Sequence, residues 1–472
     1  MTRVSAPGKV LIAGGYLVLE PLYAGAVLAA SSCFHTSVKL IQKSTEILGS
    51  GINVIVLSPQ FHQTLQGTLS ENGFTLSKES PQNPYVEKTM QVCAKALTGL
   101  LGAEFAQKLG KMAEKHSLEI TLEADNDFYS QSEHLVKRGL AMTRANLAQL
   151  PPFLPCPLND QGQAIIMKTG MGSSAALITS LVGAILRFFD AVTLPTTASS
   201  TTTAGVDIVH NLAQIAHSIA QDKIGSGFDV SAAAYGNQRY NRFHPDRIQS
   251  FVAEKNLSNI SASELTHCIK TQSLWDNVVK PFGIPPNMHM IMGDVNAGSA
   301  TVSMVRKVLA WKSADPKGSQ TLWESLNAKN MQIISCFDSL PTASDEIWLR
   351  LAATTSAKWP SIHAQLGNAL VAMQTTFYEI RALLREMGNG AGVPIEPTEQ
   401  TALIDATMQL PGVLFGGVPG AGGNDAIFAI VLHPSVLSQV ETFWSKWTAT
   451  RVSALLVDVA PSGFQGGLLE EV

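Results

Sequence analysis

The chain has 472 residues, of which 45% are hydrophobic and 15% charged, so it is long enough for two or three domains that each bury a core. This composition excludes a disordered or fibrous protein. The formal net charge of −4 gives no overall attraction to nucleic acid or to an anionic membrane, so an anionic substrate has to be bound by local groups.

The cysteine spacing and the hydropathy indicate a reducing, aqueous location. No C-x-x-C pair occurs, which favours reduced, mostly buried thiols over disulfides or a zinc site. The first residues lack the pattern of a signal peptide, and no apolar span reaches about 18 residues. We therefore expect a cytoplasmic protein that binds neither nucleic acid nor membrane and forms a monomer or a homodimer. The cysteines are Cys33, Cys93, Cys156, Cys268 and Cys336.

Strands and helices alternate in the first half of the chain. Residues 8–19 predict a strand, a tight turn at Gly14-Gly15 and a second strand. Residues 173–192 are apolar nearly all round, which predicts a buried helix. The stretch 193–205, rich in Thr and Ser, is expected to be a surface loop. Further strands are expected at 52–57 and 118–123, and further helices at 84–115 (two, broken around Gly99–Gly102), 130–147 and 207–221.

The polar segment 244–265 is the best candidate for a domain boundary, and it divides the chain into domains at 1–250 and 251–472. Mixed strands and helices on both sides of it predict two α+β domains. In the second part we expect strands at 289–295, 428–432 and 454–459, and helices at 321–337, 345–356, 361–388, 401–409 and 434–448.

Three glycine-rich segments carry the chemical signal. The first is Ser5-Ala-Pro-Gly-Lys9, followed by Gly14-Gly15-Tyr16, where a lysine at a strand can approach a phosphate or an attacking hydroxyl. A surface lysine is the alternative interpretation of this segment alone. The second runs from Lys168 to Ala176 (KTGMGSSAA) and leads into the buried helix. Its small residues let backbone N–H groups and a helix N-terminus surround a triphosphate, while Ser173 and Ser174 can cap the helix or bind phosphate or magnesium.

The third segment, 415–425 (FGGVPGAGGND), has five glycines in eight residues, more than a hairpin loop requires. Between the second and third segments stands Asp229, in Gly225-Ser-Gly227-Phe-Asp229, where an acid after a glycine turn can sit at the mouth of a cleft. A capping role is the alternative for this aspartate.

Other catalytic motifs are missing from the sequence. It contains neither a G-x-x-x-x-G-K-[ST] P-loop nor the protein-kinase motifs. The stretch 172–176 approaches the hydrolase elbow G-x-S-x-G but ends in alanine. His210 and His217, seven residues apart on one helix face, are interpreted as packing residues and not as metal ligands.

Taken in order, these segments resemble the GHMP kinases. APGKVLIAGGYLVL matches their first motif, KTGMGSSAAL their second and GVPGAGGNDAI their third. The stretches 216–243, 293–305 and 387–406 resemble the eukaryotic phosphomevalonate kinases within that superfamily, and so does GYLVLEP, where galactokinases and mevalonate kinases have a glutamate–histidine pair.

The resemblance implies a fold and a reaction. The fold is α+β, with an N-terminal domain like domain 2 of ribosomal protein S5 and a ferredoxin-like C-terminal domain. The reaction uses ATP and Mg²⁺ to convert (R)-5-phosphomevalonate to (R)-5-diphosphomevalonate, a step toward isoprenoids and sterols. Alternatives are another GHMP enzyme such as mevalonate kinase, a non-catalytic GHMP-fold binding protein, and a serine hydrolase that uses Ser173 or Ser174.

The resemblance also implies site residues. Lys9 and Asp229 are the expected catalytic residues, and Ser174 is the expected magnesium ligand. The nucleotide is expected to contact Lys168, Thr169, Gly170, Met171, Gly172, Ser173, Ser174 and Ala175. The acceptor is expected to contact Lys9, Tyr16, Ser226, Arg239, Ser299, Thr301, Gly420 and Gly422.

Two features affect the expected mechanism. Mevalonate kinases have a magnesium-binding glutamate eleven residues before the aspartate, where this chain has Ser218.

The acceptor phosphate is largely ionised near pH 7, since its second pKa is about 6, so it needs charge neutralisation more than a strong base. We expect Lys9 to screen the repulsion between the phosphates and Asp229 to orient Lys9, the acceptor or magnesium. Candidates for further cations in the cleft are Lys168, Arg239, Arg242 and Lys88.

Overall fold

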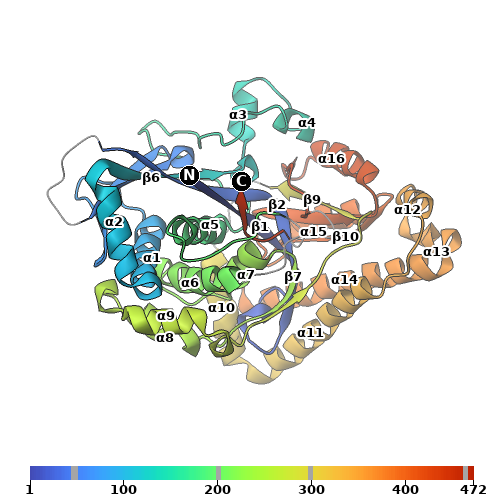
Figure 1. The fold of residues 1–472 in the computed structure, drawn as a ribbon. Helices are drawn as coiled ribbons and strands as arrows, with labels where there is room; N and C mark the ends of the chain where they lie inside the picture. The colour runs from blue at the N-terminus through green and yellow to red at the C-terminus, as the bar shows by residue number, and fades with distance from the viewer. Residues whose placement is uncertain (44–50, 198–203, 296–300, 461–465, 472) are drawn as a thin grey trace.

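Two β-sheets organise the chain in the computed structural model, which describes residues 1–43, 51–197, 204–295, 301–460 and 466–471 (Figure 1). The larger sheet has the order β13-β1-β2-β6-β3-β4-β5, with β7 paired to β2 and β8 paired to β7. The smaller has the order β10-β11-β9-β12. The larger sheet consists of β1 (Thr2–Ala13), β2 (Ala24–Gln42), β3 (Ile52–Ser58), β4 (Gln63–Ser70), β5 (Gly73–Leu76), β6 (His116–Ala124), β7 (Gln238–Asn241), β8 (Val278–Pro281) and β13 (Leu469–Glu471). The smaller consists of β9 (His289–Asp294), β10 (Val413–Gly417), β11 (Ala426–Val431) and β12 (Ser453–Ala454).

Alternation of buried and half-buried side chains explains the strands of the larger sheet. In β3 every second residue is buried, as expected for a strand with one face on the core. Strands β1, β2 and β6 pair antiparallel, whereas β3 runs parallel to β6. The end of β1 and the start of β2 are buried throughout, which indicates that structure covers both faces of the sheet there.

Helices cover one face of the larger sheet (Figure 1). The central one, α5 (Ser173–Phe188), packs on β1 and β2, and almost all of its residues from Ser173 to Leu186 are buried. It is flanked by α1 (Pro84–Leu101), α6 (Ala204–Ala220) and α7 (Phe228–Tyr235). Farther out lie α2 (Ala103–Lys115), α8 (Asp246–Ala253) and α9 (Ala262–Lys270), and on the other side of the sheet α3 (Ser132–Lys137) and α4 (Arg144–Leu147).

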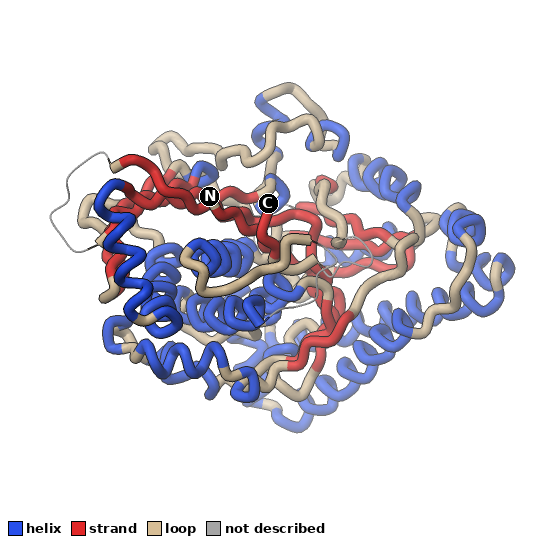
Figure 2. The backbone as a smooth tube through the Cα atoms, viewed as in Figure 1, coloured by secondary structure: helices blue, strands red, loops and turns tan. Residues whose placement is uncertain are grey.

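The smaller sheet packs on α14 (Ala364–Ala391), α15 (Thr398–Met408) and α16 (Leu437–Ser445), and Figure 2 shows its strands next to those of the larger sheet. One apolar core extends from Val4 in β1 to Phe428 in β11, so both sheets share it. The division of the chain near residue 250 stays a prediction, and β8 and β13 come from beyond that point. The helices of this half are α10 (Thr301–Ala314), α11 (Pro316–Asp338), α12 (Asp345–Ala352), α13 (Trp359–Ile362), α14 (Ala364–Ala391), α15 (Thr398–Met408) and α16 (Leu437–Ser445).

Most of the predicted elements are present, and three predictions were wrong. The expected second strand within 8–19 is a 3-10 turn at Leu17–Leu19, because Tyr16 has φ 64° and turns the chain back on itself. The helix at 130–147 is two short helices, separated where Gly139 adopts φ 65°. Of the strand at 454–459 only Ala454 is paired as a strand in β12, since the backbone N–H of Leu456 bonds the Asp127 carboxylate instead. Of the predicted surface loop at 193–205, residues 193–197 have no regular structure, 198–203 lie outside the described residues, and α6 begins at Ala204.

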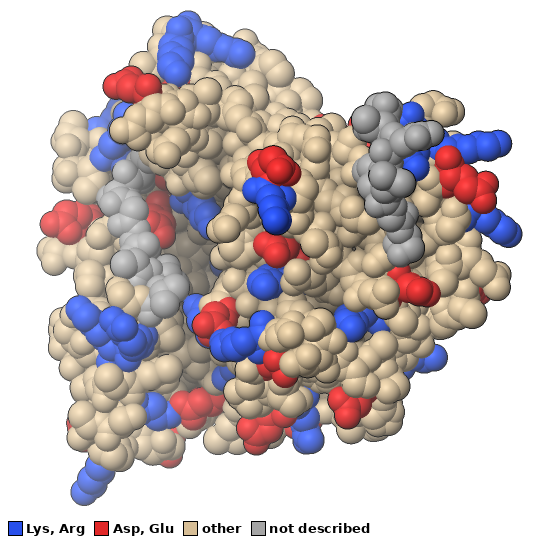
Figure 3. Space-filling view, turned by 90° about the vertical axis from the view of Figure 1, so that its left-hand side faces the viewer, with Lys and Arg blue, Asp and Glu red and all other residues tan. Residues whose placement is uncertain are grey.

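Charged side chains of both signs are interspersed on the face of the molecule shown in Figure 3. That mixture agrees with the small net charge of −4. Long-range attraction of an anionic substrate is therefore weak, and binding depends on the local arrangement of side chains.

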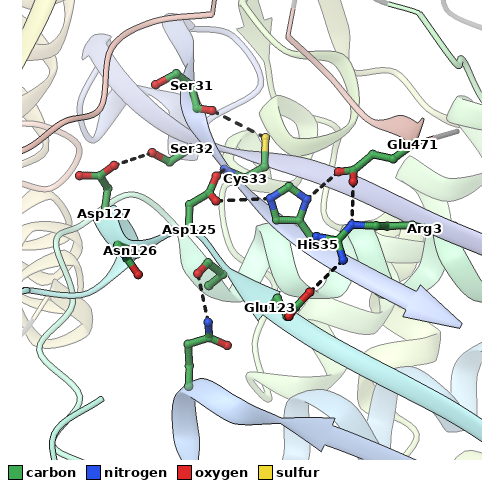
Figure 4. A network of polar contacts seen from close by, with 12 residues as sticks. Arg3, Ser31, Ser32, Cys33, His35, Glu123, Asp125, Asn126, Asp127 and Glu471 are labelled. Carbon is green, nitrogen blue, oxygen red and sulfur yellow. Dashed lines mark hydrogen bonds and ion pairs between the residues drawn. The ribbon is translucent and has the colours of Figure 1, made fainter. Parts of the chain in front are cut away.

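A polar network fastens the last described strand to the first one (Figure 4). Arg3 in β1 bonds Glu123 at 2.8 Å and Glu471 in β13 at 2.7 Å. His35 in β2 contacts the same Glu471 at 2.6 Å and Asp125 at 3.5 Å. Burial alone lowers the pKa of His35, but the hydrogen bonds and charges of Asp125 and Glu471 outweigh burial and raise it to about 9. The hydrogen bond from His35, helped by Arg3, outweighs burial and lowers the pKa of Glu471 to about 2.

The charge on His35 makes the stability of this network depend on pH. Because the pKa of His35 is raised from 6.5 to about 9, its contribution is complete below about pH 6.5 and is lost as the pH rises through about 9. We expect the wild-type protein to lose about 1–3 kcal/mol of unfolding free energy as the pH rises over that range. The His35→Gln variant should be less stable than wild type at pH 6, and it should lose less unfolding free energy than wild type when the pH rises. Urea denaturation at pH 6 and pH 9.5 measures both, and equal losses in the two proteins would contradict the assignment.

Candidate active site

Residues from all three glycine-rich segments and the acidic segment line one cleft of about 1130 Å³. The segments are far apart in the sequence, so only the fold brings them together. Lys9 comes from β1, the second segment leads into α5, and Asp229 is the second residue of α7. The lining includes Lys9, Tyr16, Lys168, Gly170, Met171, Gly172, Ser173, Ser174, Ser226, Asp229, Gly420 and Gly422.

The second segment needs glycine for two separate reasons. Gly170 and Gly172 adopt φ 80° and 78°, a left-handed conformation that other residues rarely accept. A Cβ on Gly172 would also lie 3.0 Å from Cε of Lys9. The segment is held against β1 because the Lys9 amide donates to the carbonyl of Met171 at 2.9 Å.

The serine hydroxyls in the first turn of α5 do not cap the helix, and that of Ser173 interacts with the Tyr129 hydroxyl. The residue that caps the helix is Gly172, and no side-chain cap is found in the described structure, so the capping role predicted for Ser173 and Ser174 was wrong. Ser174 Oγ instead lies 3.1 Å from Nε2 of His217 in α6. Unpaired N–H groups at this helix end, together with the hydroxyls, form a site suited to phosphate oxygens.

Lys9 extends from β1 across the cleft. Its Nζ donates to the Gly170 carbonyl at 2.8 Å and lies 5.4 Å from the centre of the Phe228 ring. Burial lowers the pKa of Lys9, and the charge of Asp229 opposes that effect. Asp229 follows Gly227, which has φ 77°, and its Oδ1 accepts from the Val230 amide at 3.0 Å. Among the described residues, no carboxylate forms an ion pair with Lys9 at 4.0 Å or less.

The third segment is tied to the first. The Tyr16 hydroxyl donates to the Ala421 carbonyl at 2.8 Å, and the Gly420 amide donates to the Leu11 carbonyl at 3.4 Å. A Cβ on Gly420 would lie 4.0 Å from Nζ of Lys9, and one on Gly422 only 2.1 Å from the Ile395 carbonyl oxygen. These contacts place the backbone of the third segment beside Lys9.

The structure places the other predicted residues in different surroundings. Thr169 is buried and its hydroxyl donates to the Asp127 carbonyl, while Ala175 is buried within α5. Lys88 and Arg239 lie outside the described cleft lining, and Nη2 of Arg239 lies 3.7 Å from Sδ of Met331.

Two of the expected phosphate contacts, Ser299 and Thr301, belong to the region where α10 starts. Ser299 lies outside the described residues. Thr301 is the first residue of α10, as the expected helix start requires.

Sequence reasoning missed several residues in the cleft. Both His210 and His217 were interpreted from the sequence as packing residues. This is confirmed for His210, which is buried and hydrogen-bonded to Asn211 at 2.8 Å. It was wrong for His217, which lines the cleft next to Ser174. A signal was available, since His217 directly precedes Ser218, the position that the comparison with mevalonate kinases singles out, and both residues line the cleft. The cations Lys223 and Arg306 were also overlooked.

The oxygen groups of the cleft suit magnesium. No group of three or more His, Cys, Asp or Glu side chains that could hold a metal occurs among the described residues. Mg²⁺ needs fewer protein ligands than that, because it commonly uses one or two carboxylates together with substrate phosphates and water. The Ser174 hydroxyl and the Asp229 carboxylate meet this requirement in kind.

Known proteins resemble the whole chain. The family model of the GHMP kinases N terminal domain matches residues 162–237. The chain is 37% identical to the peroxisomal phosphomevalonate kinase of Arabidopsis thaliana, over 97% of this chain and 94% of that protein. It is 34% identical to a phosphomevalonate kinase of Gibberella zeae, over 99% and 97%. The chain belongs to the phosphomevalonate kinase family.

Solved structures show that this phosphomevalonate kinase family member has the GHMP kinase fold. Streptococcus pneumoniae phosphomevalonate kinase in complex with phosphomevalonate and AMPPNP matches with a TM-score of 0.57 at 12% identity, over 98% of this chain and 100% of that one. A mevalonate kinase crystal structure matches with a TM-score of 0.52 at 12% identity, over 97% and 98%.

The cellular location stays a prediction. The helices of the described residues include none that is long and apolar enough to cross a membrane. The relative from Arabidopsis thaliana is named as peroxisomal, so the similarity to it does not support the predicted cytoplasmic location.

Replacing Gly172 by alanine should damage the site more than the fold. The change forces a side chain into φ 78° and pushes its Cβ against Lys9, so we expect kcat to fall at least tenfold and stability to fall by about 1–2 kcal/mol. Gly162→Ala is the matched control, with φ 74° and no atom within 4 Å of the added Cβ. Steady-state kinetics and thermal denaturation compare the two, and equal kinetic effects would refute the role of Gly172.

Proposed function

We propose that the protein transfers the γ-phosphoryl group of ATP to the phosphate of (R)-5-phosphomevalonate, giving ADP and (R)-5-diphosphomevalonate. This is the activity for which its full-length relatives are named. The observation that carries the proposal is the single cleft in which Lys9 and Asp229 lie among the glycine-rich segments. Phosphoryl transfer requires such positioning and charge neutralisation more than covalent catalysis.

We assign the nucleotide phosphates to the residues of the second segment that line the cleft, at the N-terminus of α5: Lys168, Gly170, Met171, Gly172, Ser173 and Ser174. The backbone N–H groups, the partial positive charge of the helix end and the hydroxyls of Ser173 and Ser174 support this assignment. Lys168 also lines the cleft. Mg²⁺, held by the Ser174 hydroxyl together with the nucleotide phosphates and water when bound, would neutralise part of the phosphate charge.

We assign the acceptor phosphate to the side of the cleft formed by Lys9, Asp229 and Gly420. An oxygen of that phosphate forms a bond to the γ-phosphorus while the bond from the γ-phosphorus to the bridging oxygen of ADP breaks. Lys9 lowers the repulsion between the two anions, and the negative charge of Asp229 favours the charged form of Lys9 against the effect of burial. A remaining acceptor proton can pass to the Asp229 carboxylate.

The acceptor can be tested directly. We expect ADP formation with phosphomevalonate and MgATP, with kcat/KM at least a hundredfold higher than with mevalonate, because the cations of the cleft match a phosphate better than a neutral hydroxyl. A coupled ADP assay with both acceptors, and mass spectrometry of the product, measures this. Equal or greater use of mevalonate would favour a mevalonate kinase, and failure of both would contradict the proposal.

Removing either central charge should abolish turnover and leave the fold intact. We expect Lys9→Met and Asp229→Asn each to lower kcat by about 10²–10⁴-fold at saturating MgATP, because each interaction matters most when the phosphates approach. Lys39→Met is the control for Lys9, since Lys39 is exposed on β2 and pairs with Glu119 at 2.8 Å. Circular dichroism checks the fold, and near-normal turnover in a variant would remove that residue from the mechanism.

A further inference from the structure

Arg242 is a buried cation in the cleft to which the proposed mechanism gives no role. It follows directly after β7, and only 8% of it is exposed. Its side chain nevertheless lines the cleft that contains Lys9 and Asp229.

The guanidinium group of Arg242 is incompletely paired. Nη1 donates to the Leu19 carbonyl, and Nη2 donates to the Ile224 carbonyl at 3.2 Å. These two hydrogen bonds use two of the five N–H donors of the guanidinium group and leave the other three for further acceptors. Nε is buried and has no hydrogen-bond partner in the described part of the chain. None of the carboxylates in that part forms an ion pair with Arg242 at 4.0 Å or less, and burial lowers its pKa.

A second buried arginine, Arg381, differs from Arg242 because carboxylates neutralise its charge. Arg381 in α14 is 1% exposed, and it is paired with Glu396 at 2.8 Å and with Asp405 at 2.6 Å. A buried charge without a counterion is costly. The contrast indicates that an anion from outside the chain completes the surroundings of Arg242.

The neighbouring acid does not fill that role. Glu20 also lines the cleft and follows Leu19, but its carboxylate is paired with Lys312 of α10. The exposed cations Lys223 and Arg306 add positive charge to the same lining. The cleft therefore favours a ligand with a negative group near Arg242.

The segment from Ile224 to Asp229 connects Arg242 with the reaction centre. Arg242 holds its first residue through the carbonyl of Ile224, and Asp229 at its last residue acts on Lys9. Gly225 and Ser226 line the cleft between these two points. An acceptor lying along this segment would have one end at Lys9 and the other at Arg242.

We propose that Arg242 binds the carboxylate of the acceptor and thereby selects substrates with an anionic group at both ends. This inference rests on the proposed function, in which the phosphate end has to meet the nucleotide near Lys9. The other anionic end of phosphomevalonate is its C1 carboxylate, and the planar donors of a guanidinium group match a carboxylate well.

Kinetics with two acceptors and one variant test the assignment. We expect Arg242→Met to raise the KM for phosphomevalonate about 10- to 100-fold, with kcat and the KM for MgATP changed less than threefold. With the C1 carboxamide of phosphomevalonate, which keeps the phosphate, wild type should already show the raised KM and the variant should add less than threefold. Arg247→Met is the control, since Arg247 is exposed on α8 and pairs with Asp276.

The outcomes separate this inference from the proposed function. Wild-type turnover of phosphomevalonate establishes the function whatever the variant does. If Arg242→Met affects the acid and the carboxamide equally, Arg242 does not bind the carboxylate and the inference fails. Because Arg242 also holds two backbone carbonyls, that variant can unfold. In that case the KM values of Arg242→Lys and of wild type for the acid and the carboxamide test the inference instead. A wild-type KM that is equal for the acid and the carboxamide overturns the inference by itself.

Discussion

The repulsion between two phosphate groups is the constraint on which the rest of this structure depends. Two unit charges about 4 Å apart repel by about 4 kcal/mol at an effective dielectric constant of about 20, and each phosphate carries more than one charge. A protein with a net charge of −4 cannot offset this with its overall field. It needs positive groups inside the cleft that its own carboxylates do not neutralise. Lys9, Lys168 and Arg242 meet this description, and burial lowers the pKa of each of them.

The fold positions these cations by connecting segments that are distant in the sequence. The Lys9 amide binds the second glycine-rich segment, while Tyr16 and Leu11 bind the third. Asp127 extends this support toward the end of the chain. Its backbone carbonyl accepts from Thr169 in the second glycine-rich segment, and its carboxylate accepts from Ser32 at 2.9 Å and from the Leu456 amide at 3.0 Å. The second glycine-rich segment, to which we assign the nucleotide phosphates, is therefore fixed to β2 and to the C-terminal region at once.

The parts predictable from sequence were those that depend on local backbone requirements. Glycines that adopt positive φ, such as Gly172 and Gly227, mark tight turns, and Asp229, two residues after Gly227, lines the cleft together with Lys9. Their catalytic roles stay predictions. Long elements with a clear period, such as α5 and β3, were also predictable, because burial imposes that period on the sequence.

Tertiary contacts decided the rest. The apolar stretch from Leu17 to Leu19 suits a strand, and only the left-handed Tyr16 makes it a turn. Arg239 and Arg242 are equally basic in the sequence, but their odd separation in an extended chain directs the two side chains to opposite faces, and only Arg242 lies in the cleft.

Arg381 and Arg242 show how stability and function are divided within one chain. Arg381 lies away from the cleft and forms ion pairs with two carboxylates. These ion pairs neutralise its charge in the absence of any ligand. Lys9 and Arg242 donate to backbone carbonyls instead, of Gly170, Leu19 and Ile224, which fix their positions without cancelling their charge. A carboxylate in place of these carbonyls would stabilise the empty protein and would also compete with the anionic substrate. The incomplete pairing is thus a local cost in stability that leaves the positive charge available to the ligand.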